Sequence, residues 1–160
     1  FSKKINCILS SKKIIKKYAI KSDLIIGAVL VVGRKAPKLI SRSLLRSLKK
    51  GCVLVDIAID QGGCFETSKP TTHENPVFKV DDVLHYCVTN MPGAVPFTST
   101  SALTNSTLKY IIEIANKGWK KAAKENKEIL NGINVINGKI VHKSISDAFN
   151  LKLNNINNLI

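Results

Sequence analysis

The stretch that most restricts the fold is residues 51–63, GCVLVDIAIDQGG. Apart from Asp56, residues 53–59 are apolar on both faces of an extended chain, which is typical of a strand in a parallel sheet that helices cover. Asp60 ends this expected strand, and the glycine pair after it lets the backbone approach a ligand closely. Open α/β sheets bind ligands at the carboxyl ends of their strands. Asp60 is therefore a candidate site residue, with a purely local role in turning the chain as the alternative.

The remaining segments alternate between patterns that are typical of strands and of helices. In the first half, the expected elements are a strand at 5–9, a helix capped by Ser10 or Ser11, a strand at 24–30, a helix from Ser41 to Gly51 and the strand at 53–59. The first three form a βαβ unit, whose sense should be right-handed. Together these segments predict an α/β fold with a parallel sheet and flanking helices.

The second half begins with a polar loop at residues 61–76, which is long enough to suggest a functional role in a compact domain. After it, the expected elements are extended pieces at 77–80 and 83–89 around an acidic turn, a long helix with its caps in residues 96–101, a second helix at 120–130, a hairpin at 133–141 and a short helix at 144–151. Asn137 and Gly138, flanked by apolar residues, are a strong signal for the hairpin turn.

The charge of the chain raises the question of a nucleic-acid partner. Lysine and arginine number 25 against 11 acids, which gives a formal net charge of +14. The lysines are spread over expected helices among asparagine and isoleucine, and no recognition motif accompanies them. A compositional drift, such as an AT-rich coding sequence produces, explains this more simply. We expect no nucleic-acid partner, and keep a catalytically inactive, basic binding module as an alternative.

Cysteine usage and hydropathy indicate a reducing, aqueous compartment. Cys7, Cys52 and Cys87 lie in apolar runs, as small core residues do. Together with Cys64 they form no CxxC pair and no Cys/His group with zinc spacing. No apolar run approaches the roughly 18 residues that span a bilayer. With 44% hydrophobic residues for a core, we expect a soluble cytoplasmic protein that contacts no membrane.

Three longer stretches carry a more specific signal: GAVLVVGRKAPKL at 27–39, VLVDIAIDQGGCFETSKPTTHENPVF at 53–78 and HYCVTNMPGAVPFTSTSALTN at 85–105. They resemble the carboxyl-terminal part of the alanine dehydrogenases, which use NAD to interconvert L-alanine with pyruvate and ammonium. Related stretches occur in the NAD-binding subunit of the nicotinamide nucleotide transhydrogenases, which share the fold. The resemblance implies an oxidoreductase. A transhydrogenase-type NAD-binding domain without amino-acid chemistry is the alternative.

The resemblance also implies how the chain is organised. Residues 1–95 would be the carboxyl-terminal half of a Rossmann-type NAD-binding domain, and residues 96–160 a connecting helix and tail that pack on the substrate domain. The glycine-rich phosphate loop and the substrate-binding acid–base residues would lie in a missing amino-terminal portion. The chain contains no GxGxxG motif, which agrees with that expectation. This portion alone should then be inactive, and the family implies a homo-oligomer, commonly a hexamer.

Carried over residue by residue, the resemblance makes Asp60 the catalytic carboxylate beside the nicotinamide and the substrate. The residues implied to contact NAD are Ser10 and Leu39 at the adenosine half, Ala28, Val29, Leu30, Ile57, Ala58, Ile59 and Asp60 near the nicotinamide, Val88, Thr89, Asn90 and Met91 in the bordering loop, and Lys69.

The chain departs from the family pattern at three positions. Lys69 replaces a usual arginine, which keeps the charge but loses the planar fork. Val32 replaces a usual proline and should leave its loop less rigid. Lys117 replaces a histidine that, with the glutamate matching Glu113, binds a divalent cation in some members. A cationic side chain opposes that cation, so we expect no metal site.

Overall fold

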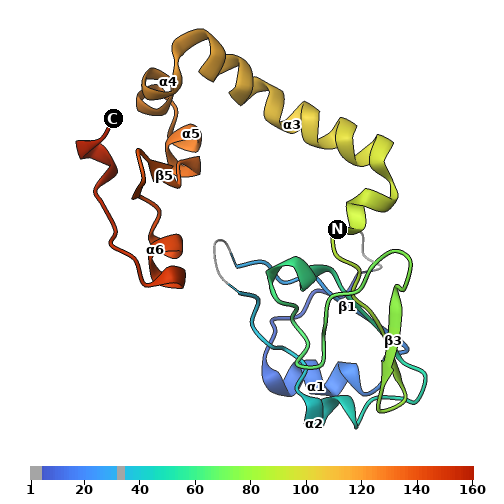
Figure 1. Cartoon of the computed structure of the whole chain (residues 1–160). Coiled ribbons are helices and arrows are strands. Elements are labelled where there is room, and N and C mark those ends of the chain that lie inside the picture. The colour runs from blue at the N-terminus through green and yellow to red at the C-terminus, as the bar shows by residue number, and fades with distance from the viewer. Residues whose placement is uncertain (1–4, 32–34) are drawn as a thin grey trace. The chain divides into compact units, whose positions relative to one another are not determined.

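The computed structural model describes residues 5–31 and 35–160, so that Val32 lies outside the described residues. The described chain forms two compact units, one comprising residues 5–31 and 35–91 and the other residues 92–160 (Figure 1). No helix in these described ranges is both long enough and apolar enough to cross a membrane.

The first unit is built on a four-stranded sheet of order β1-β2-β4-β3. Its strands are β1 (Leu24–Gly27), β2 (Val53–Asp56), β3 (Val77–Val80) and β4 (Val83–Tyr86). β1, β2 and β4 are parallel, and β3 runs antiparallel to β4. Gly27 pairs with Asp56, and Val55 pairs with Tyr86, so the three parallel strands end at one edge. The predicted α/β fold with a parallel sheet is confirmed.

Two helices, α1 (Lys12–Ala19) and α2 (Arg42–Leu45), accompany this sheet (Figure 1). Ser11 and Ser41 are their N-caps, and the Ser41 hydroxyl accepts a hydrogen bond from the backbone N–H of Leu44 at 3.2 Å. α2 is shorter than expected, because turns replace the helix well before Gly51. The core between the elements contains Leu45, Leu54, Phe65 and Val83, all nearly inaccessible to solvent.

The expected strand at residues 5–9 is wrong. These residues are described, but they form no strand and are exposed. A strand needs a hydrogen-bonded neighbour, and residues 5–9 pair with no strand of the described chain. Cys7 is accordingly exposed rather than a core residue, whereas Cys52 and Cys87 are buried as expected.

β2 ends at Asp56, so the prediction that this strand continues to Ile59 is also wrong. The 3-10 helix η1 (Ile57–Gln61) follows and stops at Gly62, whose φ of 87° is left-handed. The chain turns here because the buried Asp56 side chain binds backbone N–H groups of the loop that comes next. The strands expected at 24–30 and 83–89 likewise end early, at Gly27 and Tyr86.

The turn between β3 and β4 is the expected acidic one. Asp81 and Asp82 both have positive φ, 49° and 64°, which short polar side chains tolerate. This turn lies at the start of β4, at the end opposite to the edge where the parallel strands finish.

The second unit consists mainly of helices and a hairpin. Its elements are η2 (Met91–Ala94, which begins at the boundary), α3 (Pro96–Lys117), α4 (Trp119–Glu125), α5 (Lys127–Gly132), β5 (Val135–Ile136), β6 (Lys139–Ile140), α6 (Lys143–Phe149) and η3 (Ile156–Asn158). The long helix, the hairpin and the short helix near residues 144–151 are confirmed. Asn137 and Gly138 have φ of 48° and 75°, as a type I′ turn requires.

Two details of this unit differ from the prediction. The hydroxyl residues at 98–101 do not cap α3, because they lie inside it. Pro96 begins the helix instead, where its missing N–H costs nothing, and Ser99 donates back to the Val95 carbonyl at 3.0 Å. The helix expected at 120–130 is broken at Asn126, whose side chain caps α5 by accepting from Glu128 N–H at 2.9 Å.

Candidate functional site

Three segments leave the sheet at the edge where its parallel strands end. They follow β1, β2 and β4 and contain most of the predicted site residues. Residues 28–30 follow β1, η1 follows β2, and residues 88–91 come shortly after β4. The paired ends place these segments at a common level, which is where parallel α/β sheets bind ligands.

Asp60 lies in η1 at this edge, and its side chain is exposed. The backbone N–H of Asn90 donates a hydrogen bond to Asp60 Oδ1 at 3.3 Å. Asn90 adopts a left-handed φ of 51°, which asparagine tolerates better than most residues. The structure therefore brings together two predicted site residues from different strand ends. An exposed carboxylate held in this way can accept a hydrogen bond or a proton from a ligand.

The other predicted residues at this edge differ in exposure. Ala28, Leu30, Ile57 and Thr89 are exposed, and Val29 and Met91 are half-buried. Leu30 is 70% exposed and Ile57 is 51% exposed, so both present large apolar side chains at the surface. The remaining predicted residues, whose side chains are buried within this unit, are Ala58, Ile59 and Val88. Their side chains pack η1 and the end of β4 onto the core.

Asp56 is a residue of this region to which sequence reasoning assigned no role. It is fully buried, and its Oδ2 accepts hydrogen bonds from the backbone N–H of Cys64 at 2.8 Å and from Ser68 Oγ at 2.5 Å. The N–H of Phe65 lies 3.4 Å from the same oxygen. The sequence showed Asp56 as an acid inside an apolar run, four residues before Asp60, but nothing there distinguished a buried acid from an exposed one.

His85, in β4, was also missed. It is fully buried, its Nδ1 donates to the Val83 carbonyl at 3.1 Å, and its Nε2 pairs with Thr67 Oγ1 at 2.8 Å. Burial lowers the pKa of His85 below its ordinary value, although the Val83 carbonyl and the charge of Asp56 act in the opposite direction. A neutral imidazole thus ties the loop after η1 to β4.

Lys69 is exposed, and its Nζ lies 4.6 Å from the centre of the Phe78 ring. That ring stacks on His85 with 4.8 Å between ring centres. The structure therefore places Lys69 against β3, where its ammonium group makes a cation–π contact.

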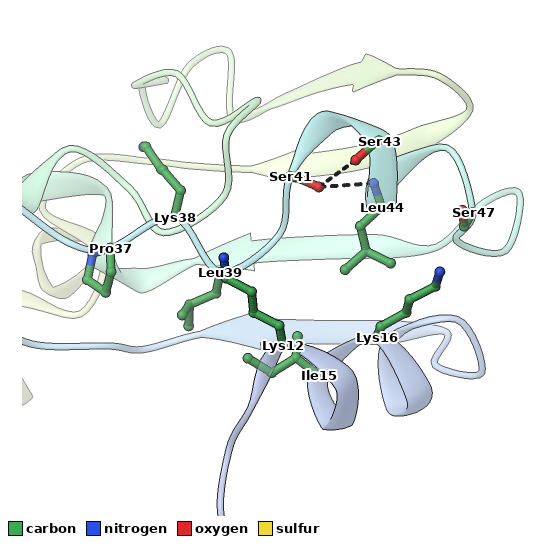
Figure 2. A pocket seen from close by; sticks show the side chains of 10 residues that line it. All are labelled: Lys12, Ile15, Lys16, Pro37, Lys38, Leu39, Ser41, Ser43, Leu44 and Ser47. Carbon is green, nitrogen blue, oxygen red and sulfur yellow. Dashed lines mark hydrogen bonds between the residues drawn. The ribbon is translucent and has the colours of Figure 1, made fainter.

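A separate groove of about 570 Å³ lies beside Leu39, the residue expected at the adenosine half (Figure 2). Its lining residues come from α1, α2 and the segments on either side of α2: Lys12, Ile15, Lys16, Pro37, Lys38, Leu39, Ser41, Ser43, Leu44 and Ser47. Ser10 is exposed just before α1 and is not one of these residues. Lys38 also braces the loop after η1, because its Nζ donates to the carbonyls of Gly62 and Gly63 at 2.6 and 2.7 Å.

Glu113 has its carboxylate fully engaged in the second unit. Lys117 Nζ and Asn126 Nδ2 each donate to it at 2.9 Å, and these hydrogen bonds hold the Glu113 pKa below its ordinary value. Lys117 also pairs with Glu125 at 2.9 Å. Within residues 5–31 and 35–160 no group of three or more His, Cys, Asp or Glu side chains is placed to hold a metal ion.

A parallel sheet with flanking helices and candidate site residues at its carboxyl edge defines the class of Rossmann-type α/β domains. Residues 1–143 match the family described as "Alanine dehydrogenase/PNT, C-terminal domain". The chain belongs to this family, and the resemblance read from its motifs is confirmed.

Individual relatives agree with the family match. The chain is 52% identical to an alanine dehydrogenase of Halomonas elongata over 149 residues, which cover 93% of this chain and 40% of that protein. It is 50% identical to one of Mycolicibacterium smegmatis over 151 residues, covering 94% and 41%. The chain therefore spans about 40% of the length of these curated relatives.

Two solved structures also resemble this chain, an alanine dehydrogenase and a transhydrogenase. An L-alanine dehydrogenase superposes with a TM-score of 0.75 at 46% identity, covering 88% of this chain and 39% of that one. A transhydrogenase from Sinorhizobium meliloti gives a TM-score of 0.60 at 26% identity, covering 83% and 36%. The alanine dehydrogenase is thus the nearer of the two in both sequence and structure.

Proposed function

We propose that the protein containing this chain is an NAD-dependent alanine dehydrogenase. It would oxidise L-alanine with NAD and water to pyruvate, ammonium, NADH and a proton, and run the reductive amination in reverse. The observation that carries the proposal is the exposed Asp60 carboxylate at the carboxyl edge of the sheet, next to Asn90, in a chain about 50% identical to named alanine dehydrogenases.

In this proposal, residues 1–95 are the second half of the NAD-binding domain, and residues 96–160 are the helix and tail that pack on the substrate domain. The relatives are more than twice as long as this chain. The phosphate loop and the substrate-binding acid–base residues would lie in the rest of the protein. We further propose a homo-oligomer, commonly a hexamer in the family, located in the cytoplasm.

The exposed side chains at the edge fit NAD. Nicotinamide and adenine are flat rings that pack on apolar surface. Leu30, after β1, and Ile57, in the same 3-10 helix as Asp60, offer such surface. Leu39 offers a further partly exposed apolar side chain at the groove of Figure 2. Bound NAD supplies the hydride acceptor.

Asp60 would act on the nitrogen of the substrate. Its carboxylate can accept a hydrogen bond from the amino group of alanine and favours the positive charge that develops there as the α-carbon is oxidised. Asn90 keeps one oxygen of this carboxylate oriented, while the other remains available to the ligand. The buried neighbours Ala58 and Ile59 hold η1 on the core and so limit the movement of Asp60.

The test is Asp60→Asn in the complete protein, measured as NADH formation from L-alanine and NAD. Loss of the carboxylate should lower kcat by about 10²- to 10⁴-fold, the usual contribution of a positioned acid–base group, with a smaller change in NAD affinity. Asp82→Asn is the matched control, because Asp82 is exposed in the turn at the opposite end of β4.

Full turnover by Asp60→Asn would make Asp60 a structural residue. A wild-type protein that binds NAD but forms no NADH from alanine would instead support the transhydrogenase-type alternative. Salt-resistant retention on heparin without any NAD binding would support the basic binding module.

A further inference from the structure

We propose that Asp56 is a positioning residue for Asp60. Its buried carboxylate closes the backbone loop that carries Asp60 and thereby sets where the catalytic carboxylate lies. This inference rests on the proposed function, in which Asp60 acts on the substrate.

The first argument is how Asp56 is bound. A fully buried carboxylate is costly unless hydrogen bonds replace its water. Asp56 receives them from Cys64 N–H at 2.8 Å, from Ser68 Oγ at 2.5 Å and, more weakly, from Phe65 N–H at 3.4 Å. The Cys64 thiol lies 3.5 Å from Oδ1, and burial with the neighbouring Asp56 raises the Cys64 pKa to about 12, so this thiol remains a donor. The donors all come from the loop after η1.

The second argument is the path of the backbone between Asp56 and Cys64. Asp56 is the residue before η1, which carries Asp60. Gly63 N–H donates to the Ala58 carbonyl at 3.0 Å, and Cys64 N–H then donates to the Asp56 side chain. Both ends of the segment that bears Asp60 are therefore fixed at Asp56. A shift of the Asp56 carboxylate would therefore be transmitted to this segment, which Lys38 also contacts at Gly62 and Gly63.

The third argument is the lack of space around this closure. Gly63 has φ of 74°, and a Cβ there would lie 2.8 Å from Asp56 Oδ2 and 2.8 Å from Ser68 Cβ. The backbone thus approaches the carboxylate more closely than any side chain permits. Among the described residues, the Asp60 side chain has a much weaker hold, a 3.3 Å contact from Asn90 N–H. The location of its carboxylate accordingly depends on the backbone that Asp56 holds.

A double-mutant cycle in the complete protein tests this dependence. Asp56→Ala should lower kcat for alanine oxidation by about 10- to 100-fold, since misplacing a catalytic group by about 1 Å has an effect of this size. In the Asp60→Asn background the same change should lower kcat by less than about 3-fold, because the carboxylate it positions is already gone. Asp56→Asn should recover most of the activity, because its amide oxygen can accept from Cys64 N–H and Ser68.

Leu45→Ala is the matched control, because Leu45 is buried in α2 of the same unit. It should destabilise the protein while changing kcat by the same small factor in both backgrounds. If Asp56→Ala does not fold, Ser68→Ala can replace it, because it removes one donor only. It should lower kcat by about 3- to 10-fold in the protein with Asp60 and leave kcat unchanged in the Asp60→Asn background.

If Asp56→Ala lowers kcat by the same factor with Asp60 and in the Asp60→Asn background, in a protein that oxidises alanine, the positioning role is overturned and the proposed function stands. A wild-type protein without alanine oxidation would overturn the proposed function, and this inference with it.

Discussion

The two units differ in where their large apolar side chains lie. In the first unit Leu54 and Phe65 are buried beneath the site, as members of a contiguous core. In the second unit, none of the 22 described residues of α3 is buried, and Phe97 is 90% exposed. The buried cluster of the second unit is small and consists of Ala122, Ala123 and Ile129. The first unit thus has a contiguous apolar core of its own, whereas α3 contributes no buried residue to a core.

The polar contacts of the two units differ in the same sense. Asp56 and His85 are buried and bind specific loop atoms in the first unit. In the second, Glu113 pairs with Lys117 near the surface, where solvent weakens such pairs. Buried networks leave few alternative arrangements, which would suit a segment that positions a catalytic group, as we propose for Asp60. The buried polar contacts of this chain thus lie near the strand ends.

The largest expected effect is the difference in stability between alanine variants of two phenylalanines. Phe65→Ala should lower the free energy of unfolding by about 3–5 kcal/mol, because it removes a large buried side chain and leaves a cavity. Phe97→Ala is the matched change in α3. It should alter the free energy of unfolding of the 160-residue chain by less than about 0.5 kcal/mol, because Phe97 is exposed there. Chemical denaturation of this chain measures both variants. A loss above about 2 kcal/mol for Phe97→Ala would contradict the difference between the two units.

A smaller difference in stability is expected between alanine variants of two glycines. A Cβ at Gly27 would lie 2.2 Å from Cys64 Sγ and 2.7 Å from the Phe65 ring, so Gly27→Ala must displace core atoms. We expect a loss of about 1–3 kcal/mol, the usual range for overpacking. At Gly132 of α5 an added Cβ meets no atom within 4 Å, so Gly132→Ala should be neutral or slightly stabilising. Equal denaturation midpoints for the two variants would contradict the tight packing inferred at Gly27.

Periodicity and turn chemistry predicted the fold class and most of the elements, because those signals are local. The serine cap at Ser41, the acidic turn at Asp81 and Asp82 and the hairpin at Asn137 all follow from the preferences of the residues concerned. The same local signals failed at residues 5–9, whose apolar pattern is that of a strand. A strand also needs a hydrogen-bonded neighbour, and the apolar pattern says nothing about whether one is present.

The site was predicted only in part, for a related reason. The family resemblance drew attention to Asp60 and Asn90, and the structure places them in contact. The apolar run does not predict that β2 stops at Asp56. The hydrogen bonds that turn the chain there come from Cys64 and Ser68, many residues later in the sequence. Long-range partners of a buried polar group leave no periodic trace in a sequence.

The smallest expected effect is a pH dependence that belongs to the first unit. His85 has a lowered pKa in the folded protein, so the unfolded chain binds its proton first as the pH falls. The free energy of unfolding of this unit should therefore be highest above the ordinary histidine pKa of 6.5 and decline below it. His85→Gln should reduce the slope of this free energy against pH by the amount that corresponds to at most one bound proton. His142→Gln in the second unit should leave the slope unchanged. Amide exchange in β2 and β4, followed from neutral to mildly acidic pH, measures the difference. A pH dependence unchanged by His85→Gln would show that the buried imidazole is not what makes the first unit sensitive to acid.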